Sequence, residues 1–228
     1  MSVQLTWLGH ATWLIETGSH TLLLDPFLDD SPTAPVGSED VHPDTILVSH
    51  GHFDHINDVS KIAARTGAHV IANFEIAEWL KDRHGIENST GMNIGGQCPR
   101  DFGTVRMTPA LHSSRLPDGS SGGAPAGFVL TLGPQRIYFA CDTALFSDMK
   151  LIGEAGLDLA VLPIGDLFTM GIDDSIAATR VLAPTRVAPA HYNTWPPIEQ
   201  DAAAWAARIR GETAAEPVVT EPGTPFSL

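Results

Sequence analysis

Three of the ten histidines fall within one short segment that also contains an aspartate. The segment runs from Ser49 to His55 and contains His50, His52, Asp54 and His55. Because His50 and His52 are two residues apart on an extended turn, both imidazoles can point to one side. Asp54 and His55 begin the next predicted helix and can face a second point nearby. Imidazole and carboxylate together suit zinc, manganese or iron, so the spacing predicts a metal site.

Taken singly, two of these residues have plainer explanations. Asp54 alone would be an ordinary N-cap of the helix that follows, and His55 alone would be a surface histidine. All four residues, however, stand together where an apolar strand gives way to a helix. Chance explains that combination poorly, and we interpret the segment as metal ligands.

The same residues carry a resemblance to a known family. His50-x-His52-x-Asp54-His55 resembles the signature of the metallo-β-lactamase-fold hydrolases. Three further residues follow in the order that this family requires, each directly after a predicted strand: His112, Asp142 and His191. The resemblance extends over nearly the whole chain.

This resemblance implies a fold, a cofactor and a ligand set. The fold would be a four-layer αββα sandwich of the α/β (α+β) class, formed by residues 1–228 as one hydrolase domain. Two divalent ions are expected, with zinc as the first choice and manganese or iron as alternatives. His50, His52 and His112 would hold one ion. Asp54, His55 and His191 would hold the other, and Asp142 would bridge the two.

Shorter motifs resemble one branch of the family, the small bacterial proteins known only as metal-dependent hydrolases (UPF0173). These motifs are Trp7–Thr12, Leu24–Pro26, Thr169–Asp174 and His191–Trp195. Relatives of that branch include a lactonase that acts on ascorbate 6-phosphate and a phospholipase D that acts on N-acyl phosphatidylethanolamines. Asp25 lies where the superfamily places an aspartate that orients the ligands. Cys141 stands where the branch often has glycine; we expect a buried small residue there, with a thiolate ligand as the alternative.

Other residues are weaker candidates for the reaction. We count Asp54 among the catalytic residues, together with His10 and Asn193. His10, after the first predicted strand, would donate a proton to a leaving group or contact a phosphate, unless it is simply structural. Asn193 would polarise a substrate oxygen. Arg115 is more simply explained as a solvated side chain than as an anion contact.

The elements that must position these residues follow from the hydrophobic pattern. Strands are predicted at 3–8, 12–16, 21–24, 46–49, 70–72, 104–108, 127–132, 136–140, 159–162 and 187–189, and helices at 56–65, 75–83, 145–154 and 199–210. Asp173-Asp174-Ser175 should cap a further helix that ends at Leu182, and residues 217–228 should form a short strand and a tail. Two sheets with helices outside satisfy this pattern. The glycine-rich segment 116–127 is either a mobile surface excursion or one of the loops in which we expect substrate choice to reside.

Composition excludes several classes of protein. The chain has 228 residues, of which 43% are hydrophobic and 18% charged, which is typical of a globular protein with a real core. The net charge of −14 argues against a nucleic-acid partner, which needs a positive surface. No apolar run is long enough for a membrane span, and we see no export signal. With only two cysteines, a cytoplasmic location is expected. The expected partner is then a small-molecule substrate. The sequence neither predicts nor excludes that the chain forms a homo-oligomer.

These observations predict a hydrolase. Two metal ions can share a hydroxide and direct it at a small ester, lactone or phosphodiester. The alternatives are a mono-iron enzyme resembling the persulfide dioxygenases and a non-catalytic metal-binding protein of the same fold.

Overall fold

Two seven-stranded sheets form the middle of the molecule in the computed structural model, which describes residues 3–228. The first sheet has the order β14-β1-β2-β3-β4-β5-β6. Its strands are β1 (Gln4–Trp7), β2 (Trp13–Glu16), β3 (Thr21–Leu24), β4 (Thr45–Leu47), β5 (His69–Asn73), β6 (Ser89–Met92) and β14 (Pro225–Ser227). The last strand of the chain therefore returns to lie beside the first.

The second sheet is built from the other half of the chain. It has the order β13-β12-β11-β10-β9-β8-β7. Its strands are β7 (Gln97–Arg100), β8 (Gly103–Pro109), β9 (Ala126–Leu132), β10 (Gln135–Phe139), β11 (Leu159–Pro163), β12 (Arg186–Ala190) and β13 (Glu216–Pro217).

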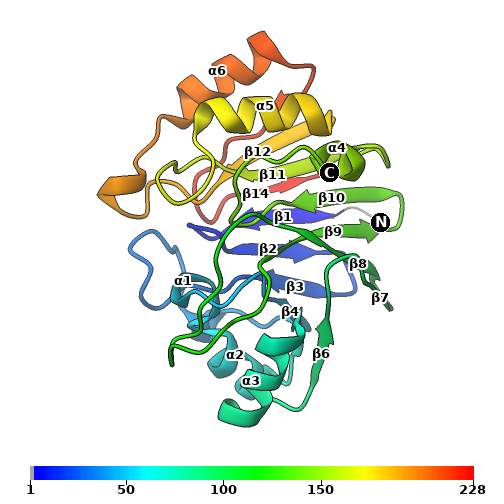
Figure 1. The fold of residues 1–228 in the computed structure, drawn as a ribbon, viewed down its shortest axis with the longest axis vertical. Helices are drawn as coiled ribbons and strands as arrows, with labels where there is room; N and C mark the ends of the chain where they lie inside the picture. Colours follow the sequence, from blue (N-terminus) through cyan, green and yellow to red (C-terminus); the bar gives the residue numbers. More distant parts are fainter. Residues whose placement is uncertain (1–2) are drawn as a thin grey trace.

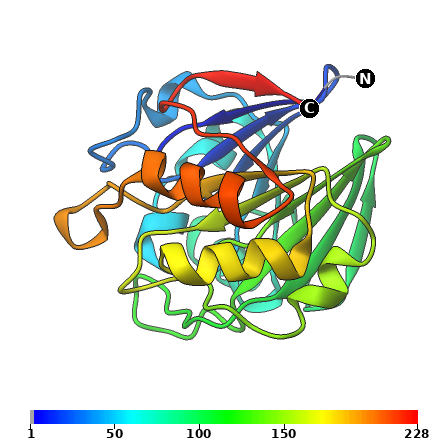
Figure 2. The same ribbon diagram turned by 90° about the horizontal axis from the view of Figure 1, so that it is seen from above.

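Helices cover the outer face of each sheet. The first sheet carries α1 (Phe53–Ile56), α2 (Val59–Thr66) and α3 (Phe74–His84), and the second carries α4 (Met149–Gly153), α5 (Ile172–Leu182) and α6 (Ala202–Glu212). Figure 1 shows α5 and α6 at one end, α2 and α3 at the other, and the strands between them. In the view from above, α5 and α6 run side by side (Figure 2). The four-layer αββα sandwich is thus confirmed.

Strand β3 shows how the sequence fits these layers. Its side chains alternate between the two faces of the sheet. Leu22 and Leu24 point into the core between the sheets, where Trp13 and Phe128 are also buried. Leu23 points the other way, into a second core against α2 and α3. A strand that is buried on both faces needs a continuous apolar run, which is what this segment has.

Strand direction decides where the site forms. In the first sheet β1 and β3 are each antiparallel to β2, and β4 is parallel to β3, so β1, β3 and β4 run the same way. In the second sheet β8 and β10 are each antiparallel to β9, and β11 and β12 are parallel to β10. The carboxyl ends of each set therefore share one edge of their sheet, and every predicted metal ligand follows one of these ends.

Several predicted helix boundaries were wrong. The helix expected at 56–65 is two helices, because the Asp58 carboxylate turns away and accepts hydrogen bonds from the Leu28 and Asp29 backbone N–H groups. The helix expected from 145 begins at Met149. The C-terminal helix starts at Ala202, because residues 196–198 form a 3-10 turn and Asp201 caps the helix.

Other elements also differ from the expectation. Asp173 and Asp174 do not cap α5; they lie in its first turn, where their charge is favourable toward the helix N-terminus. The tail forms two short strands instead of one, β13 and β14. Strands β6 and β7 were not predicted, because their polar, partly exposed sequences lack an apolar alternation.

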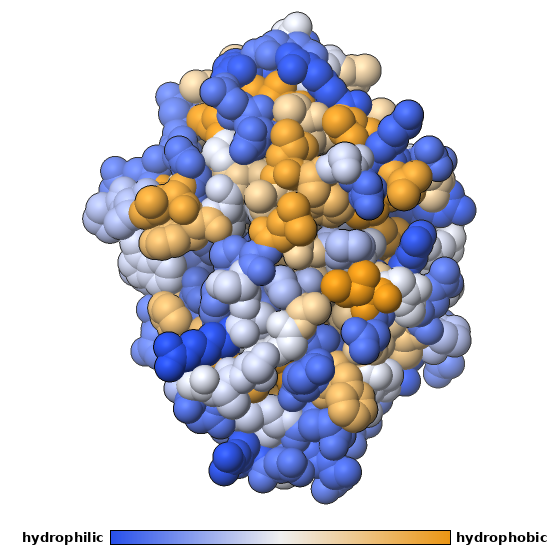
Figure 3. Space-filling model, viewed as in Figure 1, coloured by the Kyte–Doolittle hydropathy of each residue, from blue (hydrophilic) through white to orange (hydrophobic). Residues whose placement is uncertain are grey.

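The surface is largely polar. Figure 3 shows hydrophilic side chains over most of this face, interrupted by separate apolar patches that are more frequent over the half with α5 and α6. Within residues 3–228, none of the helices combines the length and the apolar character that crossing a bilayer requires.

Candidate metal centre

Three histidines from the two sheets form the first group of ligands. His50 and His52 follow β4, and His112 follows β8. Nε2 of His50 lies 2.9 Å from Nδ1 of His52. Their ligand atoms and one of His112 all lie within 4.8 Å of one another. The rings of His50 and His52 each lie 5.1 Å from that of His112. As the sequence spacing predicted, the imidazoles of His50 and His52 both point toward the same place.

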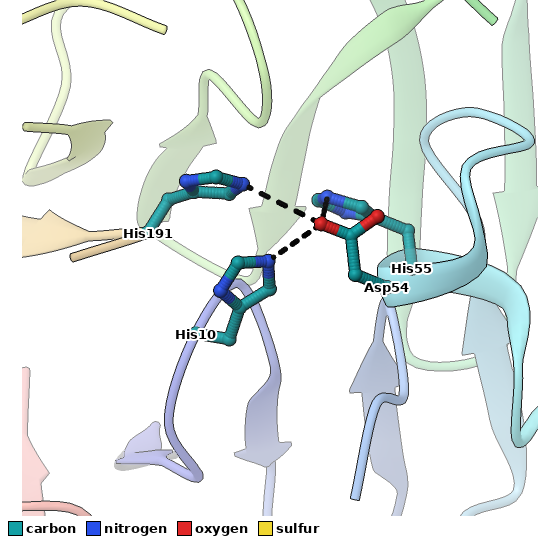
Figure 4. Close-up of side chains that lie close together, drawn as sticks. All are labelled: His10, Asp54, His55 and His191. Carbon is teal, nitrogen blue, oxygen red and sulfur yellow. Dashed lines mark hydrogen bonds and ion pairs between the residues drawn. The ribbon is translucent and has the colours of Figure 1, made fainter. Parts of the chain in front are cut away.

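A second group lies beside the first. It consists of Asp54 and His55 in α1, His191 after β12, and His10 after β1. Figure 4 shows the three histidine rings around the Asp54 carboxylate. Asp54 Oδ2 lies 3.0 Å from Nε2 of His10, 3.8 Å from Nε2 of His55 and 3.9 Å from Nε2 of His191.

Asp142 lies between the two groups. Its Oδ2 atom is 3.1 Å from Nε2 of His191 and 3.4 Å from Nε2 of His55, which belong to the second group. The same oxygen is 3.5 Å from Nε2 of His112 in the first group. One carboxylate oxygen therefore faces both groups. The structure brings together all seven residues that the sequence predicted as metal ligands.

Asp25 orients one histidine in each of the two groups. It follows β3, is fully buried, and accepts hydrogen bonds from Ser49 Oγ at 2.5 Å and from His55 Nδ1 at 2.9 Å. Because Ser49 donates to Asp25, its oxygen can accept from Nδ1 of His50, 3.0 Å away. The two bonds leave Nε2 of each histidine directed at the site. Asp25 thus has the ligand-orienting position that was expected of it.

His10 supports the second group from its buried side. Its side chain has an exposed fraction of 0%, and it does not reach the pocket above the ligands. Nδ1 lies 2.8 Å from Thr194 Oγ1 and Nε2 contacts Asp54. Burial, with the charge of His191, lowers the pKa of His10 to about 3, so the ring is neutral. Since a carboxylate only accepts, Nε2 carries the hydrogen. This geometry supports a positioning role of His10 toward Asp54 more than the expected proton donation to a leaving group.

The donor set fits divalent metal ions. Among the described residues, three buried atoms that could bind an ion lack a hydrogen-bond partner: His55 Nε2, Asp142 Oδ1 and His191 Nε2. Leaving such atoms unpaired is costly unless something else binds them. Nitrogen and carboxylate oxygen are the ligands that zinc, manganese and iron accept.

The charges at the site also favour a cation. Burial lowers the pKa of His50, His52 and His112, which keeps these rings neutral, as metal ligands must be. Burial opposes a charge on Asp142, but His191 and His55 hold its pKa well below the usual range. Burial likewise opposes a charge on His55, yet Asp142 and Asp54 raise its pKa well above the usual value. The carboxylates thus attract positive charge to this point.

A pocket of about 700 Å³ opens above the ligands. Besides the ligands His52, Asp54, His112, Asp142 and His191 it is lined by Phe53, Ser113, Leu167, Phe168, Trp195 and Pro197. The apolar residues of this pocket were not predicted from the sequence. Leu167 and Phe168 follow β11, whose carboxyl end lies at the same edge of the sheet as those of β10 and β12. Their position after such a strand is the sequence feature from which a place near the site could have been predicted.

The glycine-rich loop at 116–127 does not line this pocket. It packs instead on α3 and the strand before it: Asn73 Nδ2 donates to the carbonyls of Gly122 and Ala124, and Trp79 Nε1 donates to Asp118. The position of this loop gives no support to the expectation that it selects the substrate. We expect the segments around Leu167 and Trp195, which line the pocket, to do so.

Two further candidates have structural surroundings. Asn193 is exposed, and its Oδ1 accepts a hydrogen bond from Gln200 N at 2.7 Å; the structure does not bring it to the pocket. Cys141 has a φ of 54°, in the left-handed region that glycine adopts freely. Burial raises the pKa of its thiol, and the thiol donates weakly to the Phe139 carbonyl at 3.7 Å. The interpretation of Cys141 as a small packed residue fits this geometry better than a thiolate ligand.

Comparisons with known proteins identify the family of this chain. The family model described as the beta-lactamase superfamily domain matches residues 20–192. A UPF0173 metal-dependent hydrolase of Thermus thermophilus is 48% identical over 226 residues, which cover 99% of each chain. One of Symbiobacterium thermophilum is 45% identical, covering 99% of this chain and all of its own. The solved structure of Igni18, a metallo hydrolase of Ignicoccus hospitalis, is similar with a TM-score of 0.90 and 32% identity, covering 100% of this chain and 99% of its own. The chain therefore belongs to the beta-lactamase superfamily and, within it, to the UPF0173 metal-dependent hydrolases.

Proposed function

We propose that this chain hydrolyses a small ester, lactone or phosphodiester at a centre of two divalent metal ions, with zinc as the first choice. The observation that supports this proposal is the position of Asp142. Its Oδ2 atom lies within 3.5 Å of ring nitrogens from both ligand groups. A carboxylate in that position suits a bridge between two ions, as in other two-metal hydrolytic sites.

Each residue then has a definite task. His50, His52 and His112 would hold one ion, Asp54, His55 and His191 the other, and Asp142 would contact both. When bound, such ions lower the pKa of water and polarise the oxygen of the substrate bond. Asp25 fixes the ring orientation of His55 directly and of His50 through Ser49, and His10 holds the carboxylate of Asp54. The pocket walls exclude water around the substrate.

Metal analysis followed by a substrate panel tests the proposal. Protein purified without chelator should contain close to two transition-metal ions per chain. It should hydrolyse members of a panel of lactones, carboxylic esters and phosphodiesters, and it should do so without oxygen and with redox-inert zinc. A single ion with full activity would contradict the dinuclear centre.

The alternatives predict other results from the same samples. Oxygen consumption with a persulfide, in the absence of any hydrolysis, would indicate dioxygenase-like chemistry. Two bound ions with no turnover on any substrate class would indicate a metal-binding protein. His52 favours hydrolysis over one other reaction class only, that of the oxygen-reducing di-iron branch of the superfamily, which places glutamate at this position.

A further inference from the structure

The pocket above the metal ligands has a polar floor and apolar walls. The floor consists of the ligand residues, with Asp142 at its centre. The walls consist of Phe53, Leu167, Phe168, Trp195 and Pro197. Phe53, Leu167 and Phe168 have exposed fractions of 55%, 67% and 54%. Several large apolar side chains grouped at one opening are uncommon on a polar surface and usually mark a binding site.

One wall is a rigid aromatic cluster. The rings of Phe53 and Trp195 lie 6.1 Å apart. Buried Phe27 supports both from behind, with ring centroids 5.8 Å from Phe53 and 5.9 Å from Trp195. Phe53 also precedes the ligand Asp54 in α1, so this wall is fixed to the floor. An apolar group placed here would meet a preformed surface.

The remaining exposed wall residues, Leu167 and Phe168, belong to a strained loop. Asp166 and Leu167 have φ values of 62° and 41°, a region that non-glycine residues seldom adopt. Hydrogen bonds hold the loop in this form: Asp166 N donates to Met170 O at 3.0 Å, Leu167 N donates to Asp166 Oδ1 at 2.8 Å, and Met170 N donates to Thr143 O at 3.1 Å. Thr143 follows Asp142, so this wall is also tied to the floor. Strain kept at such a place points to a functional use of the exposed side chains.

The pocket offers no cationic side chain to an anionic substrate. Among residues 3–228, no lysine or arginine lines it, and the chain as a whole carries a net charge of −14. Sites that recognise a phosphate on the substrate normally supply arginine, lysine or a helix N-terminus for it. A substrate with a phosphate group away from the reacting bond would find apolar side chains and the hydroxyl group of Ser113 here, without a positive charge to pair with.

We propose that these walls bind an apolar chain or ring next to the scissile bond, so that the substrate class is a neutral carboxylic ester or lactone with an apolar substituent. This inference rests on the proposed function. It narrows that function, because it favours substrates with an apolar substituent and disfavours those that carry a phosphate group away from the reacting bond, such as phosphate-bearing lactones. Leu167 and Phe168 are the specificity-determining residues, since both side chains are more than half exposed and lie outside the ligand set, whereas Phe53 adjoins the ligand Asp54 in the chain.

A series of γ-lactones that differ only in alkyl tail length tests the proposal on the metal-loaded protein. We expect kcat/KM to rise by about fourfold for each tail methylene that becomes buried, until the tail leaves the pocket. A lactone of the same ring that carries a phosphate group should be the poorest substrate. In Leu167→Ser and Phe168→Ser, the ratio of kcat/KM for the longest over the shortest lactone should fall by about tenfold.

Matched variants control for general effects. Phe74→Ser in α3 removes a phenylalanine with an exposed fraction of 55%, and Leu151→Ser in α4 removes a leucine with 61%, both outside the pocket. These two should keep the wild-type ratio. A ratio independent of tail length in the wild type, with hydrolysis intact, would overturn the inference and leave the proposed function standing.

A binding measurement keeps the test independent of turnover. Isothermal titration calorimetry of the metal-loaded protein should show octanoate binding at least about tenfold more tightly than acetate, which requires only two buried methylenes. Leu167→Ser should reduce that preference, whereas Leu151→Ser should not. If no lactone, ester or phosphodiester is hydrolysed but the preference is present, the proposed function fails while the apolar pocket stands. Hydrolysis of phosphodiesters alone would overturn the inferred substrate class and leave the proposed function standing. If Leu167→Ser instead converts a dimer to a monomer in sedimentation analysis, the walls form an interface with a second copy of this chain and the proposal is overturned.

Discussion

The carboxylate of Asp25 lies 2.9 Å from Nδ1 of His55 and fixes the ring that Asp142 faces on its other side. The same carboxylate reaches His50 through Ser49, at 2.5 Å and then 3.0 Å. One buried aspartate therefore orients one histidine in each ligand group. Neither histidine can turn without breaking a hydrogen bond in the protein interior.

Asp25→Asn should weaken both metal sites. The amide can no longer accept from Ser49 and His55 in the same way, and loss of such an orienting group typically lowers metal affinity by roughly 10- to 100-fold. Competition with a chelator measures the effect for each ion. Ser49→Ala is the matched control, because it removes only the hydrogen bonds that connect Asp25 to His50. It should therefore weaken mainly the binding of one ion. Wild-type affinity in Asp25→Asn would show that the hydrogen bonds do not position the ligands.

Asp142→Ala should abolish turnover and leave a folded chain. Asp142 faces histidines of both groups, so its loss should separate the ions or release one of them. We expect kcat to drop by several orders of magnitude while the circular dichroism spectrum is unchanged. Elemental analysis of the same sample reports whether an ion was lost. Wild-type activity in this variant would remove Asp142 from the site.

His10→Ala should act through Asp54 and not through the leaving group. The ring is buried and contacts the Asp54 carboxylate, so its loss frees that ligand to rotate. We expect kcat to fall by roughly 10- to 100-fold for both good and poor leaving groups, with weaker binding of one ion. His10→Gln can still donate to Asp54 and should restore part of the loss. A loss confined to poor leaving groups would instead support proton donation by His10.

The stability of the chain should depend on Asp29 in acid. The ammonium group of Lys61, 2.8 Å away, and the backbone N–H of Ser38 lower the pKa of Asp29 to about 2 from its ordinary 3.8. A carboxylate with a lowered pKa stabilises the fold fully above its unfolded value, and this contribution is lost as the pH falls through the folded value. Asp29→Ala should therefore be less stable than the wild type at pH 6, by an amount that shrinks between about pH 4 and pH 2.

Urea unfolding of both proteins at a series of pH values measures this difference. Asp82→Ala is the control, because Asp82 is an exposed residue of α3. Its effect on the free energy of unfolding should be small at every pH. A difference for Asp29→Ala that stays constant from pH 6 to pH 2 would contradict the assigned contacts.

Four of the candidate metal ligands could be predicted from a local pattern, because His50, His52, Asp54 and His55 form one short motif. His112, Asp142 and His191 were implied only by the family resemblance, because a single residue after a strand carries no local signal of its own. The role of His10 could not be predicted, because the sequence does not show that its ring is fully buried against Asp54.

The pocket walls were missed for a different physical reason. A run such as Leu167-Phe168 resembles core sequence, and only the strained turn at Asp166 exposes it. Trp195 likewise resembles a core residue until the chain is folded around Phe27. The polar strands β6 and β7 were overlooked because pairing with a neighbouring strand, and not an apolar pattern, makes them strands.

Each ligand group takes residues from both sheets: His50 and His52 from the first with His112 from the second, and Asp54 and His55 from the first with His191 from the second. Bound ions would therefore cross-link two halves of the sandwich that come from different parts of the chain. The unfolded chain does not hold these ligands together, so ion binding and folding become thermodynamically linked. At a free ion concentration of about 100 times the Kd, one site adds about 2.7 kcal/mol to the free energy of unfolding. The lifetime of this protein would then depend on the supply of metal in its surroundings.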